Sequence, residues 1–283
     1  MTILRDDATT GSGDDDALLK LVAACETPPF NQPVALSPSA DKQITLLQPH
    51  PDDVALSMVA SLARMKASPS IITVFSESAD AETRRAEDTA FAQACGGAVF
   101  SLGFAEHVSR MAVPNEITHE VRRSIDHRLS IETAPLIAPA AISHHPDHRV
   151  VHVVAQEIGC RIFWEDVAFW GIYSSSIDDR VLFTRRGDID LRTYSLVAVD
   201  VTPFIATKAA ALRFYRSQSS DVWRPLRYAW TAARELGVPF EYCERFFVHM
   251  DAFGLFEDLF GGRLAEWGQF SYGDRMVATM SLP

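Results

Sequence analysis

Two short stretches of the chain carry histidines and carboxylates at spacings that could bind a metal and move protons. The first is "PHPDD", with His50, Asp52 and Asp53, and the second is "SHHPDH", with His145 and His148. Each follows an apolar run, "ITLL" or "APLIAPAAI", of the kind that forms a buried strand. Neutral imidazole and carboxylate oxygen are good zinc ligands. Because two adjacent aspartates point in different directions, one could bind a metal while the other acts as a base.

The first stretch alone also fits a simpler interpretation, in which Asp52 or Asp53 caps the following helix. The second stretch favours the metal interpretation, because His145 and His148 are three residues apart across a helix start and can face the same side. A catalytic zinc site needs three protein ligands and an open position for water. His148 and His152 form a further HxxxH pair, but the pair lacks the glutamate of HExxH. We therefore expect His152 to be packed or solvated.

Strand-like and helix-like segments alternate along most of the chain, which predicts an α/β fold. We expect a Rossmann-like, doubly wound and mostly parallel sheet with helices on both faces. Ligands of such sheets bind beyond the carboxyl ends of the strands, where both polar stretches lie. The expected strands are 43–49, 70–78, 98–104, 134–142, 161–166, 195–201 and 244–250, and the expected helices are 53–67, 81–97, 115–131, 146–159, 203–218 and 225–237.

The chain divides into three predicted regions. Residues 1–43 contain a polar flexible segment, a short helix and a proline-rich wrapping arm. Residues 44–250 form the main domain, and residues 251–283 form an extension whose Phe, Leu and Trp content predicts packing on the core. A rim for the substrate pocket, or a subunit interface of a homo-oligomer, are the other interpretations of this extension.

Composition excludes several classes of protein. The formal net charge of the 283 residues is −11, with 26 Lys and Arg against 37 Asp and Glu, which disfavours nucleic-acid binding. The four cysteines are far apart and without CxxC spacing, so we expect free thiols in a reducing compartment. No apolar run approaches the roughly 18 residues of a membrane span. The acidic N-terminus differs from a signal peptide, and we place the protein in the cytoplasm.

The two polar stretches resemble the paired signatures of the LmbE-like, or PIG-L, zinc-dependent de-N-acetylases. The resemblance continues in "IITVFSES" followed by "RRAEDTAFAQACGG", in "SLGFAE", in "FWEDVAFW", in "VDVTPFIATKAAALRFYRSQ" and in "YCERF". It extends from about Ile44 to about Met250, with the motifs in the family's order. The family implies an α/β deacetylase domain over this range.

The resemblance also implies a set of metal ligands and a base. His50, Asp53 and His148 match the positions that bind Zn²⁺ in the family, and Fe²⁺ or Co²⁺ would suit the same ligand types. Asp52 matches the general base that takes a proton from the zinc-bound water. His145 matches the general acid or oxyanion partner.

Other positions carry weaker implications. Asp147 would orient His145. Arg84 matches an arginine that contacts substrate, although it could equally form an i,i+3 ion pair with a glutamate on its own helix. Glu106 stands where many members have an aspartate that binds sugar hydroxyls. His144 is a candidate substrate contact or a plain loop histidine.

Two positions depart from the family. Val54 replaces the glutamate of the usual HPDDE, and Ser143 stands where some members have a tyrosine that helps to stabilise the oxyanion. These changes leave the matched ligands intact but put the substrate preference and the source of oxyanion stabilisation in question.

The sequence therefore predicts a zinc hydrolase that removes an acyl group, most simply acetyl, from an amino sugar or an N-acetylglucosamine-containing conjugate. One alternative is an amidase that acts on a thiol conjugate or a natural-product intermediate. A second alternative is a catalytically silent binding or scaffold protein. The presence of Asp52 and His145, which only catalysis requires, argues against a silent protein.

Overall fold

The computed structural model describes residues 42–106, 115–129, 134–142, 145–167, 193–218, 223–270 and 275–280. The predicted N-terminal helix and wrapping arm lie outside the described residues, as do Ser143 and His144.

Nine strands form one mixed sheet in the order β3-β2-β1-β4-β5-β7-β6-β9-β8. Strands β3, β2, β1, β4 and β5 run parallel to one another, β7 is antiparallel to β5 and β6, β9 is parallel to β6, and β8 is antiparallel to β9. The mostly parallel α/β sheet predicted from the alternating pattern is thus confirmed. The strands are β1 (Lys42–Gln48), β2 (Ala67–Glu77), β3 (Ala98–Ala105), β4 (Leu136–Pro139), β5 (Ile162–Trp164), β6 (Tyr194–Asp200), β7 (Cys243–His249), β8 (Ala265–Phe270) and β9 (Arg275–Met280).

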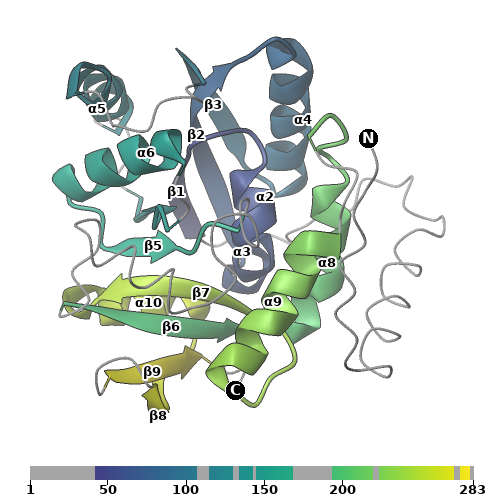
Figure 1. Ribbon diagram of the computed structural model, residues 1–283, viewed down its shortest axis with the longest axis vertical. Coiled ribbons are helices and arrows are strands. Elements are labelled where there is room, and N and C mark those ends of the chain that lie inside the picture. The colour runs from purple at the N-terminus through teal and green to yellow at the C-terminus, as the bar shows by residue number, and fades with distance from the viewer. Residues whose placement is uncertain are drawn as a thin grey trace.

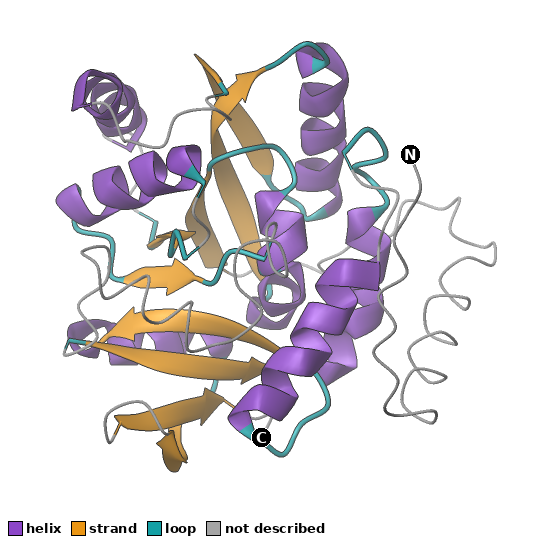
Figure 2. Ribbon diagram, in the orientation of Figure 1, coloured by secondary structure: helices purple, strands orange, loops and turns teal. Residues whose placement is uncertain are grey.

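Helices cover both faces of the parallel part of the sheet (Figures 1 and 2). Successive residues of a strand point to opposite faces, so Ile44 and Leu46 of β1 join one buried cluster and Leu47 joins the other. Helices α2, α3, α4 and α8 contribute to the first cluster, and α5 and α6 to the second. The helices are α2 (Asp53–Ser57), α3 (Val59–Met65), α4 (Ala81–Ala94), α5 (Asn115–Leu129), α6 (Pro146–Glu157), α8 (Ile205–Leu212), α9 (Trp223–Leu236) and α10 (Phe253–Phe260), with 3₁₀ turns at Thr202–Phe204 and Met250–Ala252.

Two predicted helices differ from the structure. The helix expected over 53–67 is divided at Met58, whose φ is −138°, although its N–H still donates to the Val54 carbonyl at 2.9 Å. The division is therefore a kink in one ladder of hydrogen bonds. The helix expected over 203–218 is regular only as α8, and a turn after it places Tyr215 inside the core.

The segment after residue 250 contributes to the same sheet. Phe256 and Phe260 of α10 pack on Phe246 of β7 with ring centroids 5.5 and 5.7 Å apart. Strand β9 then pairs with β6, so the last strands extend the sheet begun in the main domain. The domain boundary near residue 250 stays a prediction. Within the described ranges, no helix has the length and apolar character needed to cross a bilayer.

Candidate active site

The two polar stretches meet at one edge of the sheet. The first follows β1 and the second follows β4, and these strands are parallel neighbours. Their carboxyl ends therefore face the same side, which brings His50, Asp53, His145 and His148 together. The ring centroids of the three histidines lie 4.8–5.4 Å apart. The structure thus assembles, from two loops far apart in the sequence, the cluster that the spacing predicts.

The backbone at Asp52 is in a left-handed conformation, with φ of 100° and ψ of −25°. Such a conformation costs a non-glycine residue roughly 1–3 kcal/mol and persists only where neighbours hold it. The loop is held by the Phe75 N–H, which donates to the Pro49 carbonyl at 2.8 Å, and by the His50 N–H, which donates to Asp53 Oδ2 at 2.8 Å. The Asp52 side chain makes no capping hydrogen bond to α2. The helix-cap interpretation therefore does not account for Asp52.

Asp53 lies at the separation from two imidazole nitrogens that a tetrahedral metal site requires. Asp53 Oδ2 lies 3.4 Å from His50 Nδ1 and 3.4 Å from His148 Nε2. Metal–ligand bonds of about 2.0–2.1 Å in a tetrahedron place neighbouring ligand atoms about 3.3–3.4 Å apart. Two imidazole nitrogens and one carboxylate oxygen are also the donor types that zinc accepts. The geometry and the chemistry of these residues fit a divalent metal. His50 and His148 also form, with His145, a group whose ligand atoms all lie within 4.8 Å of one another.

Each of the two imidazoles nearest Asp53 is held through its other ring nitrogen by a buried carboxylate. His50 Nε2 lies 3.0 Å from Asp147 Oδ2, and His148 Nδ1 lies 2.8 Å from Asp166 Oδ2. These contacts leave His50 Nδ1 and His148 Nε2, the atoms closest to Asp53, to face the metal position. Carboxylates commonly orient metal-binding histidines in this way.

Asp147, predicted to orient His145, contacts two of the histidines. Its carboxylate reaches His50. It is the backbone N–H of Asp147 that meets His145, donating to Nδ1 at 3.3 Å at the start of α6. Because Nδ1 accepts this bond, the ring proton of neutral His145 is on Nε2, which can donate.

The surroundings give the two adjacent aspartates different pKa values. Burial and the neighbouring charge of Asp53 raise the pKa of Asp52 well above its usual value. Burial also acts to raise the pKa of Asp53, but His148 and His50 outweigh it and lower that pKa to about 2. Carboxyl groups whose pKa values are pushed apart can take different roles, one ionised and one exchanging a proton.

His50 and His145 also have pKa values shifted in opposite directions. Burial alone would lower the pKa of His50, but hydrogen bonds to Asp147 and Asp53 raise it to about 10. Burial, with His148 and His50 nearby, lowers the pKa of His145 to about 4. His145 is therefore a neutral hydrogen-bond donor near pH 7.

Arg84 and Glu106, both predicted to contact substrate, form an ion pair with each other. Arg84 lies on α4 and is near enough to Asp52 to lower its pKa electrostatically. Its alternative partner, Glu87, instead accepts a hydrogen bond from the Ser217 N–H at 2.9 Å. The Arg84–Glu106 pair thus stands beside the predicted base.

His152 is a core residue, as expected. It is fully buried, its Nδ1 donates to the Pro139 carbonyl at 2.8 Å, and its ring packs on Phe163 with centroids 4.7 Å apart. Asp166, by contrast, was not identified as a site residue from the sequence. The only signal for it was its place in "FWED", which follows β5, the strand next to β4.

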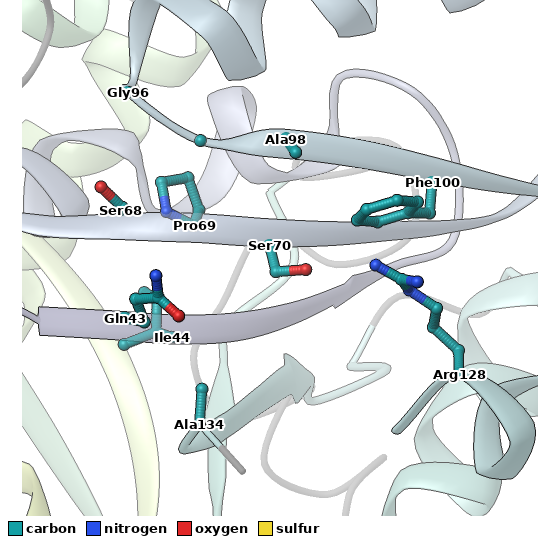
Figure 3. Close-up of a pocket in the computed structure, with 11 residues that line it drawn as sticks. Gln43, Ile44, Ser68, Pro69, Ser70, Gly96, Ala98, Phe100, Arg128 and Ala134 are labelled. Atoms are coloured by element: carbon teal, nitrogen blue, oxygen red, sulfur yellow. The ribbon is translucent and has the colours of Figure 1, made fainter. Parts of the chain in front are cut away.

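A separate pocket of about 510 Å³ lies at the amino ends of β1, β2 and β3, the opposite edge from the histidines (Figure 3). There the Arg128 guanidinium stacks over the Phe100 ring, 3.3 Å from its centroid. None of the predicted site residues lines this pocket. It therefore has no part in the predicted chemistry.

No protein-family model matches the chain. A 2'-N-acetylparomamine deacetylase from Streptomyces fradiae is 28% identical over 219 residues, which are 65% of this chain and 77% of that protein. This relative supports the resemblance to the LmbE-like, or PIG-L, de-N-acetylases that the two motifs carry.

Solved structures share the fold of this chain. A deacetylase triple mutant of the teicoplanin biosynthetic pathway matches with a TM-score of 0.56 and 21% identity, covering 73% of this chain and 97% of that one. The 4-carboxy-2-hydroxymuconate hydratase GalB of Pseudomonas putida KT2440 matches with a TM-score of 0.50 and 14% identity, over 74% and 96% of the two chains. Because a hydratase has the fold too, the reaction of this protein must be argued from its site.

Proposed function

We propose that the protein is a metal-dependent hydrolase that removes an N-acyl group, most simply acetyl, from an amino sugar. One observation carries the proposal. Asp53 Oδ2 lies 3.4 Å from both His50 Nδ1 and His148 Nε2, as ligand atoms of a tetrahedral site do, and Asp52 next to it neither caps the helix nor belongs to that proposed ligand set. A structural site would not need the additional carboxylate.

His50, Asp53 and His148 would hold the metal, which we propose to be Zn²⁺, with Fe²⁺ or Co²⁺ as the alternatives. When bound, the metal supplies a Lewis acid that lowers the pKa of water and polarises the amide carbonyl. Asp147 and Asp166 keep the two imidazoles turned toward that position.

Asp52 would move the proton. Its raised pKa suits a group that accepts a proton from the attacking water and returns it to the departing amine. The amine needs that proton because an amide anion is a very poor leaving group. A single carboxyl group could serve both steps, since it regains its charge when the amine leaves.

His145 would stabilise the oxyanion of the tetrahedral intermediate. Its Nδ1 is occupied by the Asp147 N–H, so the proton on Nε2 is the one available to the substrate. Between the two roles left open for His145, this geometry favours a neutral donor over a general acid. Removing one such donor costs other enzymes roughly 10²–10³-fold in kcat.

The substrate class is proposed from the relative and from the site rim. The relative's name gives 2'-N-acetylparomamine, an N-acetylated amino sugar, as its substrate. The Arg84–Glu106 pair beside Asp52 offers donors and acceptors suited to sugar hydroxyls. We therefore place this chain's substrate among N-acylated amino sugars, including those of natural-product intermediates.

Acetate release from a panel of substrates tests the proposal. The panel comprises N-acetylglucosamine, an N-acetylglucosaminide with a thiol aglycone, and 2'-N-acetylparomamine. Protein stripped by a chelator should release no acetate, and re-adding Zn²⁺ should restore release from at least one amino-sugar substrate. Release only from the thiol conjugate would favour the amidase alternative. Tight zinc binding without turnover of any N-acyl substrate would favour the scaffold alternative.

A further inference from the structure

Asp166 contacts one of the predicted metal ligands, His148. Its side chain is buried, with 1% exposure, and its Oδ2 lies 2.8 Å from His148 Nδ1. His148 is itself fully buried, and its other nitrogen faces Asp53 at 3.4 Å. The carboxylate therefore determines which nitrogen of the ring carries the proton and which presents a lone pair.

The backbone around Asp166 is fixed at successive residues. The Trp164 carbonyl accepts from the Ala140 N–H at 2.7 Å, and the Val167 N–H donates to Ser57 Oγ at 3.2 Å. Ser57 lies at the end of α2, the helix that begins at Asp53. The segment that carries Asp166 is thus tied to the end of β4 and to α2, the elements next to the two polar stretches.

A buried ion pair anchors the same segment from the other side. The Glu165 carboxylate binds Arg245 of β7, and the Glu165 N–H donates to the Arg245 carbonyl at 3.0 Å. Arg245 also donates to the Tyr228 hydroxyl at 2.6 Å. Both charged side chains are almost fully buried, so this anchor is dry and rigid.

We propose that Asp166 is a positioning residue for the metal site. It holds His148 in the tautomer with the proton on Nδ1 and keeps Nε2 directed at the position shared with Asp53. The buried Glu165–Arg245 pair keeps the Asp166 carboxylate in place. This inference rests on the proposed function for the presence of a metal, but it concerns affinity and does not depend on which substrate is hydrolysed.

Zinc affinity measured by competition with a chromogenic chelator, without substrate, tests the inference. The Asp166→Ala variant should bind Zn²⁺ about 10–100-fold more weakly than wild type, the usual effect of removing such a partner. The Asp166→Asn variant retains an acceptor for Nδ1–H and should recover part of that loss. A Glu244→Gln variant, which changes an equally buried carboxylate that binds Lys208, serves as the matched control and should keep wild-type affinity.

A double-mutant cycle distinguishes positioning from a general structural role. If Asp166 acts through His148, adding Asp166→Ala to His148→Ala should weaken zinc binding no further. Full additivity of the two losses, or wild-type affinity in Asp166→Ala, would overturn the inference. Failure of the proposed function would look different, because zinc binding would respond as described while no N-acyl substrate was hydrolysed.

Discussion

Asp88 provides a measurable link between the core and the active-site loop. It is fully buried on α4 and accepts hydrogen bonds from Gln48 Nε2 at 2.9 Å, Thr73 Oγ1 at 2.6 Å and the Tyr215 hydroxyl at 2.7 Å. Gln48 in turn accepts a hydrogen bond from the Val54 N–H at 3.3 Å, in the first turn of α2. The Asp88 carboxylate thus links α4 to β1, to β2 and to the segment after α8.

Replacing Asp88 with alanine should lower the free energy of unfolding by about 3 kcal/mol at neutral pH. The Thr73 and Tyr215 hydroxyls lose their acceptor, while Gln48 Nε2 keeps Thr73 Oγ1 as a second one, and each unsatisfied group costs about 1–3 kcal/mol. Removing a buried charge offsets part of that loss. The expected decrease in the free energy of unfolding is therefore near the lower end of the sum of these costs. Urea denaturation followed by circular dichroism measures the change, with an unchanged m-value as evidence that the denatured state is the same. A loss below about 1 kcal/mol would refute the reasoning.

The same variant has a predicted pH dependence. Burial raises the pKa of Asp88 above its usual 3.8, so the folded state holds this proton more tightly than the unfolded state. The stabilisation linked to that proton is complete below pH 3.8 and is lost as the pH rises through the folded pKa. The penalty of Asp88→Ala should therefore be larger near pH 4 than at pH 7. A Tyr215→Phe variant, which removes one donor and leaves the carboxylate, is the control and should cost less than half as much at pH 7.

Three further predictions concern stability and reactivity. Burial raises the thiol pKa of Cys95 and of Cys160 from 9.0 to about 12, so both should resist iodoacetamide at pH 9 in the native protein and react in urea. Between these pKa values the unfolded thiol loses a proton that the folded one keeps, so stability should fall by about 1.4 kcal/mol per pH unit for each thiol. Lys208→Met should cost about 3–5 kcal/mol by leaving Glu244 buried without its partner, whereas replacing both with apolar residues should recover most of it. Free Zn²⁺ at about 100 times its Kd should raise the free energy of unfolding by about 2.7 kcal/mol, and a stability independent of zinc would argue against the site.

The parts of the site that the sequence could predict are those encoded locally. His50 and His148 each lie in a short motif directly after an apolar run, and parallel strands place such motifs at one edge. The order β3-β2-β1-β4-β5 makes the two carrying strands neighbours, which the alternating pattern alone does not specify. That the two motifs would meet was predictable for another reason, because both contain the residue types that bind one metal.

The partners of these residues were not predictable in the same way. Asp166 reaches His148 only because β5 pairs with β4, and Asp88 reaches Gln48 only because α4 packs on β2, the neighbour of β1. Both contacts depend on pairing between distant segments, which leaves no periodic signal in the sequence. The contact between the Asp147 carboxylate and His50 was likewise not predictable, because proximity to His145 in the sequence does not give the direction in which the side chain leaves α6.

The kcat of an Asp52→Asn variant, measured with its zinc content, tests the central claim most directly. The introduced amide would be similar in size to the native carboxylate but could not accept a proton from water. Because Asp52 lies outside the proposed ligand set, the variant should bind one zinc per chain as wild type does. Its kcat for acetate release should fall by about 10²–10⁴-fold, the usual contribution of a general base. A fully zinc-loaded variant with undiminished kcat would contradict the assignment of Asp52 as the group that moves the proton.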